Sequence, residues 1–109
     1  YVSDVNLSDG TTVSAGSRFT KIWLVHNSGS IAWPEGTQIV FTGGFVNGHV
    51  SAFPVPSALP NEVVEVSIDT TAPEESGDYA QFWRLMDPTG SKFGDRLWLR
   101  LNVLMGDQL

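Results

Sequence analysis

Hydrophobic and polar residues alternate along this chain in short runs, and no stretch repeats with a helical period. An alternation with period two places successive side chains on opposite faces of a strand, so each run predicts a half-buried β-strand. Turn-forming Gly, Pro, Asn and Asp residues separate the runs, which is typical of an antiparallel β-sandwich of about seven to eight strands. The clearest predicted strands are Thr11–Val13, Arg18–Asn27, Thr37–Thr42, Glu62–Thr70, Gly77–Leu85 and Arg96–Leu104.

The run Gly77–Leu85 carries large apolar residues on both of its faces, which predicts a central strand with a neighbour on each edge. It also has the spacing of an immunoglobulin tyrosine corner, in which a tyrosine lies two residues before a cysteine. The tyrosine would be Tyr79, and the cysteine position holds Gln81. We therefore expect an immunoglobulin-like sandwich without a disulfide.

Two turn signals and a group of prolines define the middle of the chain. Asp9-Gly10 predicts a turn ahead of the first strand, and Asn47-Gly48 predicts a tight hairpin because both residues accept positive φ. Gly43-Gly44 is interpreted as a bulge and turn rather than a phosphate-binding loop. The prolines between residues 54 and 60 exclude a central strand there and predict an edge or crossing segment.

Length and composition narrow the class of protein. The chain has 109 residues, which is enough for one domain, and we expect residues 1–109 to be a single domain taken from a longer protein. It has no cysteine, so a disulfide scaffold, a zinc ribbon and a thiol nucleophile are excluded. The net charge of −6 argues against a nucleic-acid ligand and favours a neutral or basic protein partner. No run is long and apolar enough to insert into a membrane.

Strand alternation separates the aromatic residues into an interior and an exterior set. Trp23, Trp83, Tyr79, Phe19 and Phe41 are predicted to form the structural core, where contact between indole rings replaces the disulfide. Trp33, before Pro34, is expected to cap the edge of the core.

If Leu97, Leu99 and Leu101 point inward, the residues between them point outward. This predicts an aromatic–arginine face, made by Phe82, Arg84, Trp98 and Arg100 with Met86 and Val40 further along. Aromatic and arginine side chains are enriched at protein interfaces, so this face is the candidate cargo-binding site. The alternative is a cation–π pair of Trp98 with Arg84 or Arg100 that closes the sheet surface without a partner. On the opposite sheet, Ile22 and Leu24 are expected to be covered by the N-terminal segment.

Several separated blocks occur in an order that resembles a known family. They are Asp9-Gly10-Thr11, Ala15-Gly16-Ser17 with Phe19, Lys21 and Trp23, Asn27-Ser28-Gly29 with Trp33, Ala72-Pro73 with Gly77 and Tyr79, Trp83-Arg84-Leu85, and Phe93-Gly94 with Arg96 and Trp98. This set resembles the FW (four-tryptophan) domain, the immunoglobulin-like domain of the next-to-breast-cancer-one class of selective autophagy receptors. The resemblance runs from about Asp4 to Leu104, and residues Gly43 to Ala58 match no block of the pattern.

The resemblance implies a non-enzymatic module that binds protein cargo, as a peptide segment or a surface patch. It implies a cytoplasmic receptor that is delivered with its cargo to the autophagosome and then to the vacuole or lysosome. In fungal members the implied cargo includes vacuolar hydrolases. Autophagy proteins of the ubiquitin-like class would be bound through other parts of the full-length protein.

Motifs for catalysis or for a cofactor do not emerge from the sequence. His26 and His49 have no partner at i+2 or i+4, so neither is expected to bind a metal, and no cofactor is expected. Two alternatives to cargo binding remain. One is a carbohydrate-binding module, which would need Trp33 and Trp98 to be exposed and coplanar, and the other is a structural spacer with all four tryptophans inside.

Overall fold

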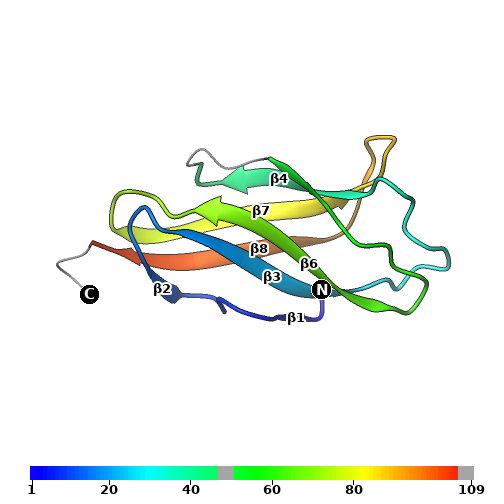
Figure 1. Cartoon of the computed structure of the whole chain (residues 1–109), viewed down its shortest axis with the longest axis horizontal. Coiled ribbons are helices and arrows are strands. Elements are labelled where there is room, and N and C mark those ends of the chain that lie inside the picture. The colour runs from blue at the N-terminus through cyan, green and yellow to red at the C-terminus, as the bar shows by residue number, and fades with distance from the viewer. Residues whose placement is uncertain (47–50, 106–109) are drawn as a thin grey trace.

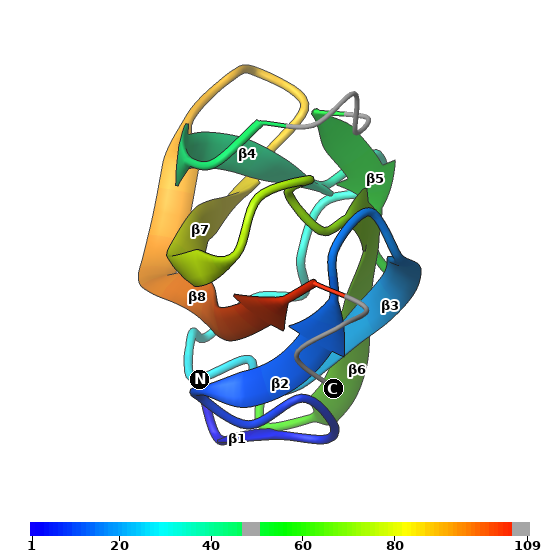
Figure 2. The ribbon, with the colours of Figure 1, turned by 90° about the vertical axis from the view of Figure 1, so that its left-hand side faces the viewer.

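In the computed structural model the chain forms two β-sheets packed face to face, and residues 1–46 and 51–105 are described (Figure 1). Figure 2 shows the two sheets end-on, with β3 and β6 on one side and β8, β7 and β4 on the other. The strands are β1 (Ser3–Asp4), β2 (Thr11–Ser14), β3 (Arg18–His26), β4 (Gln38–Gly44), β5 (Ala52–Pro54), β6 (Val63–Thr71), β7 (Gly77–Met86) and β8 (Lys92–Leu104). Neither described part of the chain contains a helix that could span a membrane.

The smaller sheet has the order β1-β3-β6, and its two long strands follow the predicted alternation. Along β3, Lys21, Trp23 and Val25 are buried, while Arg18 and His26 are exposed. Along β6, the buried positions alternate in the same way with the exposed Glu65, Ser67 and Asp69. Each strand therefore contributes one apolar face to the interior.

The larger sheet has the order β2-β8-β7-β4-β5, which confirms that β7 is central. The short strand β5 ends at Pro54 and lies at the edge, as the prolines predict. The sandwich is not wholly antiparallel, because β2 runs parallel to β8, with Thr11 opposite Leu101. The chain turns at Ser8–Gly10, crosses from the smaller sheet to the larger one and enters β2 in the direction of β8.

The pairing of β4 with β7 contains the predicted bulge at Gly43-Gly44. The register shifts between Phe41 and Gly43, and Gly44 has a φ of 100°. A Cβ at Gly44 would collide with the backbone carbonyl of Ala80, so the close approach of β4 to β7 requires glycine. The predicted hairpin at Asn47-Gly48 lies outside the described residues.

The core between the sheets is held by two polar connections as well as by apolar packing. Trp23 of β3 and Trp83 of β7 are fully buried. The Trp23 Nε1 donates to the backbone carbonyl of Trp98 in the opposite sheet at 3.0 Å. Gln81 is also fully buried, and its Nε2 donates to Thr70 Oγ1 of the opposite sheet at 3.1 Å and to the Phe45 carbonyl at 3.0 Å. Its Oε1 accepts from Trp83 Nε1 at 3.3 Å.

The N-terminal segment is fixed to β3 by a buried ammonium group. Lys21 is 0% exposed, and its Nζ forms an ion pair with Asp4 at 3.0 Å. The same Nζ donates to the carbonyls of Asn6 at 2.6 Å and Leu7 at 2.9 Å. An ammonium has three N–H donors, so all three can be satisfied here, which is what makes burial of this charge tolerable.

The remaining aromatic residues of the predicted core are half-buried and pack against it. Phe41 meets Trp83 edge to face at 5.5 Å, and Tyr79 meets Phe45 at 5.9 Å. Phe19 also contacts the buried cluster. Within the described residues the Tyr79 hydroxyl has no hydrogen bond, so the bond that defines a tyrosine corner is not formed, although the ring lies over Gly77.

Candidate protein-binding face

The solvent side of β7 and β8 brings the main residues of the aromatic–arginine face together. Phe82 lies directly opposite Trp98, and Ala80 lies opposite Arg100. On the other edge of β7, Arg84 lies opposite Val40 of β4. Burial alternates along both strands, so these side chains project away from the core. The result is a surface on which two aromatic rings are flanked by guanidinium groups.

Trp98 is the most exposed of the four tryptophans, at 40%. Its ring stacks on Tyr1, with centroids 6.2 Å apart and an angle of 27°, and its Nε1 donates to Asp9 Oδ2 at 3.2 Å. The alternative predicted a cation–π contact of Trp98 with Arg84 or Arg100, and neither contact forms among the described residues. Instead, the Arg96 guanidinium lies over the Phe82 ring, 4.5 Å from its centroid.

Arg96 is the residue of this surface that sequence reasoning missed. The register between β7 and β8 shifts between Trp83 and Leu85, so that the segment Gly94–Arg96 bulges opposite Arg84. Gly94 has a φ of 74°, and a glycine inside a strand pattern was the available signal for such a bulge. The bulge is secured by Arg84, whose Nη2 donates to the Gly94 carbonyl at 2.9 Å. The Nε of Arg84 is buried and has no partner among the described residues.

Two further residues of the predicted face contribute less surface than expected. Val40 is 8% exposed because Arg84 of β7 and Ala52 of β5 lie on either side of it. Met86 is half-buried at the end of β7, opposite Lys92 and Gln38. The accessible part of the face is therefore centred on Phe82, Trp98 and the neighbouring cations.

A hollow of about 440 Å³ opens at one end of the sandwich, where the loops at 27–37 and 87–91 meet. Its walls include the apolar side chains of Trp33, Phe93 and Leu85, and Trp33 meets Phe93 edge to face at 6.1 Å. Asn27 shapes the longer loop, because its Nδ2 donates to the carbonyls of Ile31 and Ala58, both at 3.0 Å.

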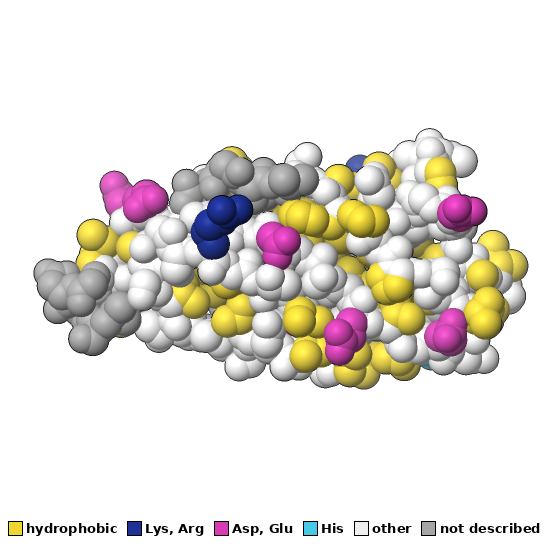
Figure 3. Space-filling view, in the orientation of Figure 1, with side chains coloured by type: hydrophobic (Ala, Val, Ile, Leu, Met, Phe, Trp, Pro, Cys, Tyr) yellow, Lys and Arg dark blue, Asp and Glu magenta, His cyan; other side chains and the backbone are white. Residues whose placement is uncertain are grey.

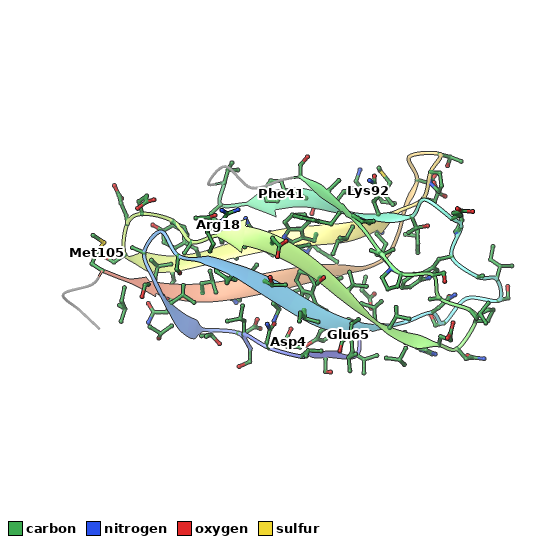
Figure 4. All side chains as sticks on the ribbon, viewed as in Figure 1. Asp4, Arg18, Phe41, Glu65, Lys92 and Met105 are labelled. Atoms are coloured by element: carbon green, nitrogen blue, oxygen red, sulfur yellow. The ribbon has the colours of Figure 1, made fainter. Side chains whose placement is uncertain are left out.

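The exposed side of the smaller sheet differs from the predicted arrangement. The N-terminal segment does not cover Ile22 and Leu24; it pairs beside them as β1, with Ser3 opposite Leu24. Both residues are half-buried, and Val63 on β6 is 50% exposed. Figure 3 shows this side as apolar patches interspersed with carboxylates, and Figure 4 labels Glu65 of β6 there, with Arg18 at the start of β3.

The geometry bears on the carbohydrate-binding alternative and on the two histidines. Trp33 is only 8% exposed, so it cannot form a sugar-stacking platform with Trp98. Among residues 1–46 and 51–105, no three His, Asp or Glu side chains gather as a metal site. His26 is exposed at the end of β3, and His49 lies outside the described residues.

Comparison with known proteins finds relatives that match nearly the whole length of the chain. The sequence profile of the family described as "Ig-like domain from next to BRCA1 gene" matches residues 6–103. The chain is 42% identical to Protein NBR1 homolog of Arabidopsis thaliana, over 94% of the chain and 15% of that protein. It is 36% identical to Protein ILRUN of Danio rerio, over 100% of the chain and 38% of that protein. With Next to BRCA1 gene 1 protein of Homo sapiens it shares 33% identity, over 92% of the chain and 11% of the relative.

Proposed function

Because the chain belongs to the family of the immunoglobulin-like domain from next to BRCA1 gene, we propose that it is a non-catalytic, protein-binding module that recognises protein cargo. The observation that carries the proposal is the pairing of Phe82 with Trp98 on the solvent side of the larger sheet, with arginines on both flanks. Aromatic and arginine side chains dominate binding hot spots because they bury large areas and donate several hydrogen bonds. The exposed side of a sheet that carries such residues suits an extended peptide or a small surface patch.

The wider role that we propose is selective autophagy or delivery from the cytoplasm to the vacuole or lysosome. The chain spans 15% and 11% of the length of the plant and human relatives, so this role would belong to a longer protein. In that arrangement the present domain holds the cargo, and other parts of the receptor bind ubiquitin-like autophagy proteins. In a fungal receptor the cargo would include vacuolar hydrolases.

The test is a comparison of captured proteins between the chain and a variant of the face. The variant is Phe82→Ala with Arg100→Ala, which removes an aromatic ring and a guanidinium from neighbouring positions. Arg84 is left in place, because its bond to the Gly94 carbonyl secures the bulge. The immobilised chain is exposed to cytosol of the source organism, and bound proteins are identified by mass spectrometry and then tested with purified chain.

The matched control makes the same kind of change on the opposite sheet. Arg18→Ala with Val63→Ala also removes one guanidinium and one apolar side chain, both from exposed positions. We expect some proteins to be captured by the parent chain and by this control but not by the face variant. Both variants should unfold at nearly the same temperature as the parent chain. A partner set that is identical for all three proteins would place binding elsewhere on the domain.

A further inference from the structure

The basic residues of this acidic chain are gathered on one side. The sequence contains six Lys and Arg residues against twelve Asp and Glu. Arg84, Lys92, Arg96 and Arg100 all project from the solvent side of β7 and β8, and we call these four residues the basic cluster. Of the other two, Lys21 is buried against Asp4, and Arg18 lies at the start of β3 on the opposite sheet.

The charges of the basic cluster are not neutralised within the described residues. None of the four forms an ion pair there, since the salt bridges of the described chain involve Lys21 and the N-terminal amine. Of the carboxylates on or beside this face, Asp9 accepts the Trp98 indole and Asp95 pairs with the N-terminal amine at 3.5 Å. Asp78 is exposed on the same side of β7 but forms no ion pair with the basic cluster among the described residues. Exposed cations that lack a counter-ion within the described chain are what a carboxylate ligand would pair with.

We infer that the aromatic–arginine face takes an acidic segment of its protein partner, a conclusion that rests on the proposed function. The net charge of −6 favours a basic partner for the chain as a whole, but four of its six Lys and Arg residues project from this one face. Complementary charge steers partners and sets specificity, so the local field decides what docks here. The opposite sheet, with Glu65 and Asp69 exposed, would repel the same segment.

The spacing of the cations indicates the form of the ligand. Arg96 and Arg100 are four residues apart on one strand, which places their α-carbons roughly 13 Å apart. In an extended peptide, residues i and i+4 share a side and have the same separation. A strand-like segment with acidic residues at alternate positions would therefore place carboxylates beside both arginines. The apolar atoms of the same peptide segment would lie against the rings of Phe82 and Trp98.

A protein ligand is favoured over a nucleic acid by the size and setting of the cluster. Nucleic-acid binding draws most of its affinity from phosphates neutralised by many Lys and Arg residues. Here four cations lie on a domain whose other exposed surface is acidic, so a long polyanion would meet repulsion beyond the face. A short acidic segment would not extend that far.

The experiment measures binding of labelled dodecapeptides to the 109-residue chain by fluorescence anisotropy. The probes are an alternating Glu-Ser peptide, matched Gln-Ser and Lys-Ser peptides, and a dodecathymidylate. We expect the Glu-Ser peptide to bind most tightly, and its affinity to fall as salt is added. Arg100→Gln and Arg96→Gln should each weaken this binding by about two- to fivefold, the effect of losing one exposed charge pair. Lys92→Gln, Arg96→Gln and Arg100→Gln together should weaken it by at least about tenfold.

Arg18→Gln is the matched control, since it removes one exposed arginine from the opposite sheet and should leave binding unchanged. Arg96→Glu with Arg100→Glu should reverse the preference, so that the Lys-Ser peptide binds more tightly than the Glu-Ser peptide. Equal binding of the Glu-Ser and Gln-Ser peptides, or an Arg18→Gln effect as large as that of Arg100→Gln, would overturn the inference. So would tighter binding of dodecathymidylate, or sedimentation showing that the face pairs with a second copy.

The two proposals can fail separately. If captured partners depend on Phe82 and Arg100 while the peptides show no preference for carboxylates, the face binds cargo but not through acidic residues. If capture does not depend on the face, the proposed binding surface itself is wrong.

Discussion

The indole of the buried Trp23 donates a hydrogen bond across the sandwich to the backbone carbonyl of Trp98. Trp98 thus belongs to two environments at once, since its backbone is held from the core while its ring lies outside against Tyr1. The position of an exposed ring on the aromatic–arginine face is therefore set by a residue of the opposite sheet. Core and surface aromatics in this domain are one connected system.

Replacing Trp23 with Phe tests this connection. The variant keeps an aromatic ring but loses the N–H donor and some volume, so we expect a loss of about 2–3 kcal/mol in the free energy of unfolding. Urea denaturation measures the loss, and the emission of Trp98 should change as its backbone is released. A variant as stable as the parent chain would show that the bond does not tie the sheets together.

Gln81 offers a second test, because it occupies the position where a cysteine would stand in an immunoglobulin domain. Gln81→Leu removes the side-chain hydrogen bonds with Thr70, Phe45 and Trp83 and should cost roughly 2–3 kcal/mol of stability. Thr70→Val removes only one of them with little change of shape, and about 1 kcal/mol is expected. If the two variants unfolded at the same denaturant concentration, the amide would not act as the inter-sheet bridge.

Lys21→Met should release the N-terminal segment. It leaves Asp4 and the carbonyls of Asn6 and Leu7 without their cation, and breaking a buried ion pair typically costs about 3–5 kcal/mol. Hydrogen exchange of the amides at residues 2–7 should accelerate relative to those of β7. Arg18→Met, on the same strand but exposed, is the control and should cost less than about 0.5 kcal/mol.

Acrylamide quenching should find one accessible indole. Trp23 and Trp83 are 0% exposed and Trp33 is 8%, against 40% for Trp98. The strongly quenched component of the emission should therefore vanish in Trp98→Phe and persist in Trp33→Phe. Four equally shielded tryptophans would support the structural-spacer alternative instead.

Acid should loosen the loop at residues 87–91. The Thr89 hydroxyl, followed by the Ser91 amide, donates to Asp87 Oδ1 and lowers the pKa of that carboxyl from its ordinary 3.8. A lowered pKa means that these bonds stabilise the loop above pH 3.8 and are lost as the pH falls through the folded-state pKa. NMR shifts of the Thr89 and Ser91 amides should follow this titration, and Asp87→Asn should remove it. Amide shifts that do not move at acidic pH would contradict the assignment.

Much of the fold follows from alternation alone. β3, β6 and β7 lie within one residue of their predicted ends because their apolar period is regular and Gly or Pro residues bound them. The parallel pairing of β2 with β8 could not be read from the sequence, since a strand of four residues carries no signal of direction. It depends instead on where the turn at Ser8–Gly10 sends the chain.

The aromatic–arginine face was likewise predictable where side chains alternate regularly along a strand, and not where a bulge changes the register. Phe82, Arg84, Trp98 and Arg100 were placed together because they alternate with buried leucines and tryptophans on adjacent strands. The same alternation also points Arg96 outward, but its position over Phe82 depends on the bulge at Gly94 and could not be read from the sequence. The burial of Lys21 was indicated by its position among Phe19, Trp23 and Val25, but its partners come from the N-terminal segment and could not be deduced from local pattern.

The parallel ladder of β2 and β8 has a mechanical consequence. Pulling the chain toward its start at Thr11 and toward its end at Leu104 would slide these two strands past each other. In that geometry the backbone hydrogen bonds of Thr11–Ser14 with β8 would all bear the force together. In a hairpin pulled at its open end, the hydrogen bonds would instead break one pair at a time.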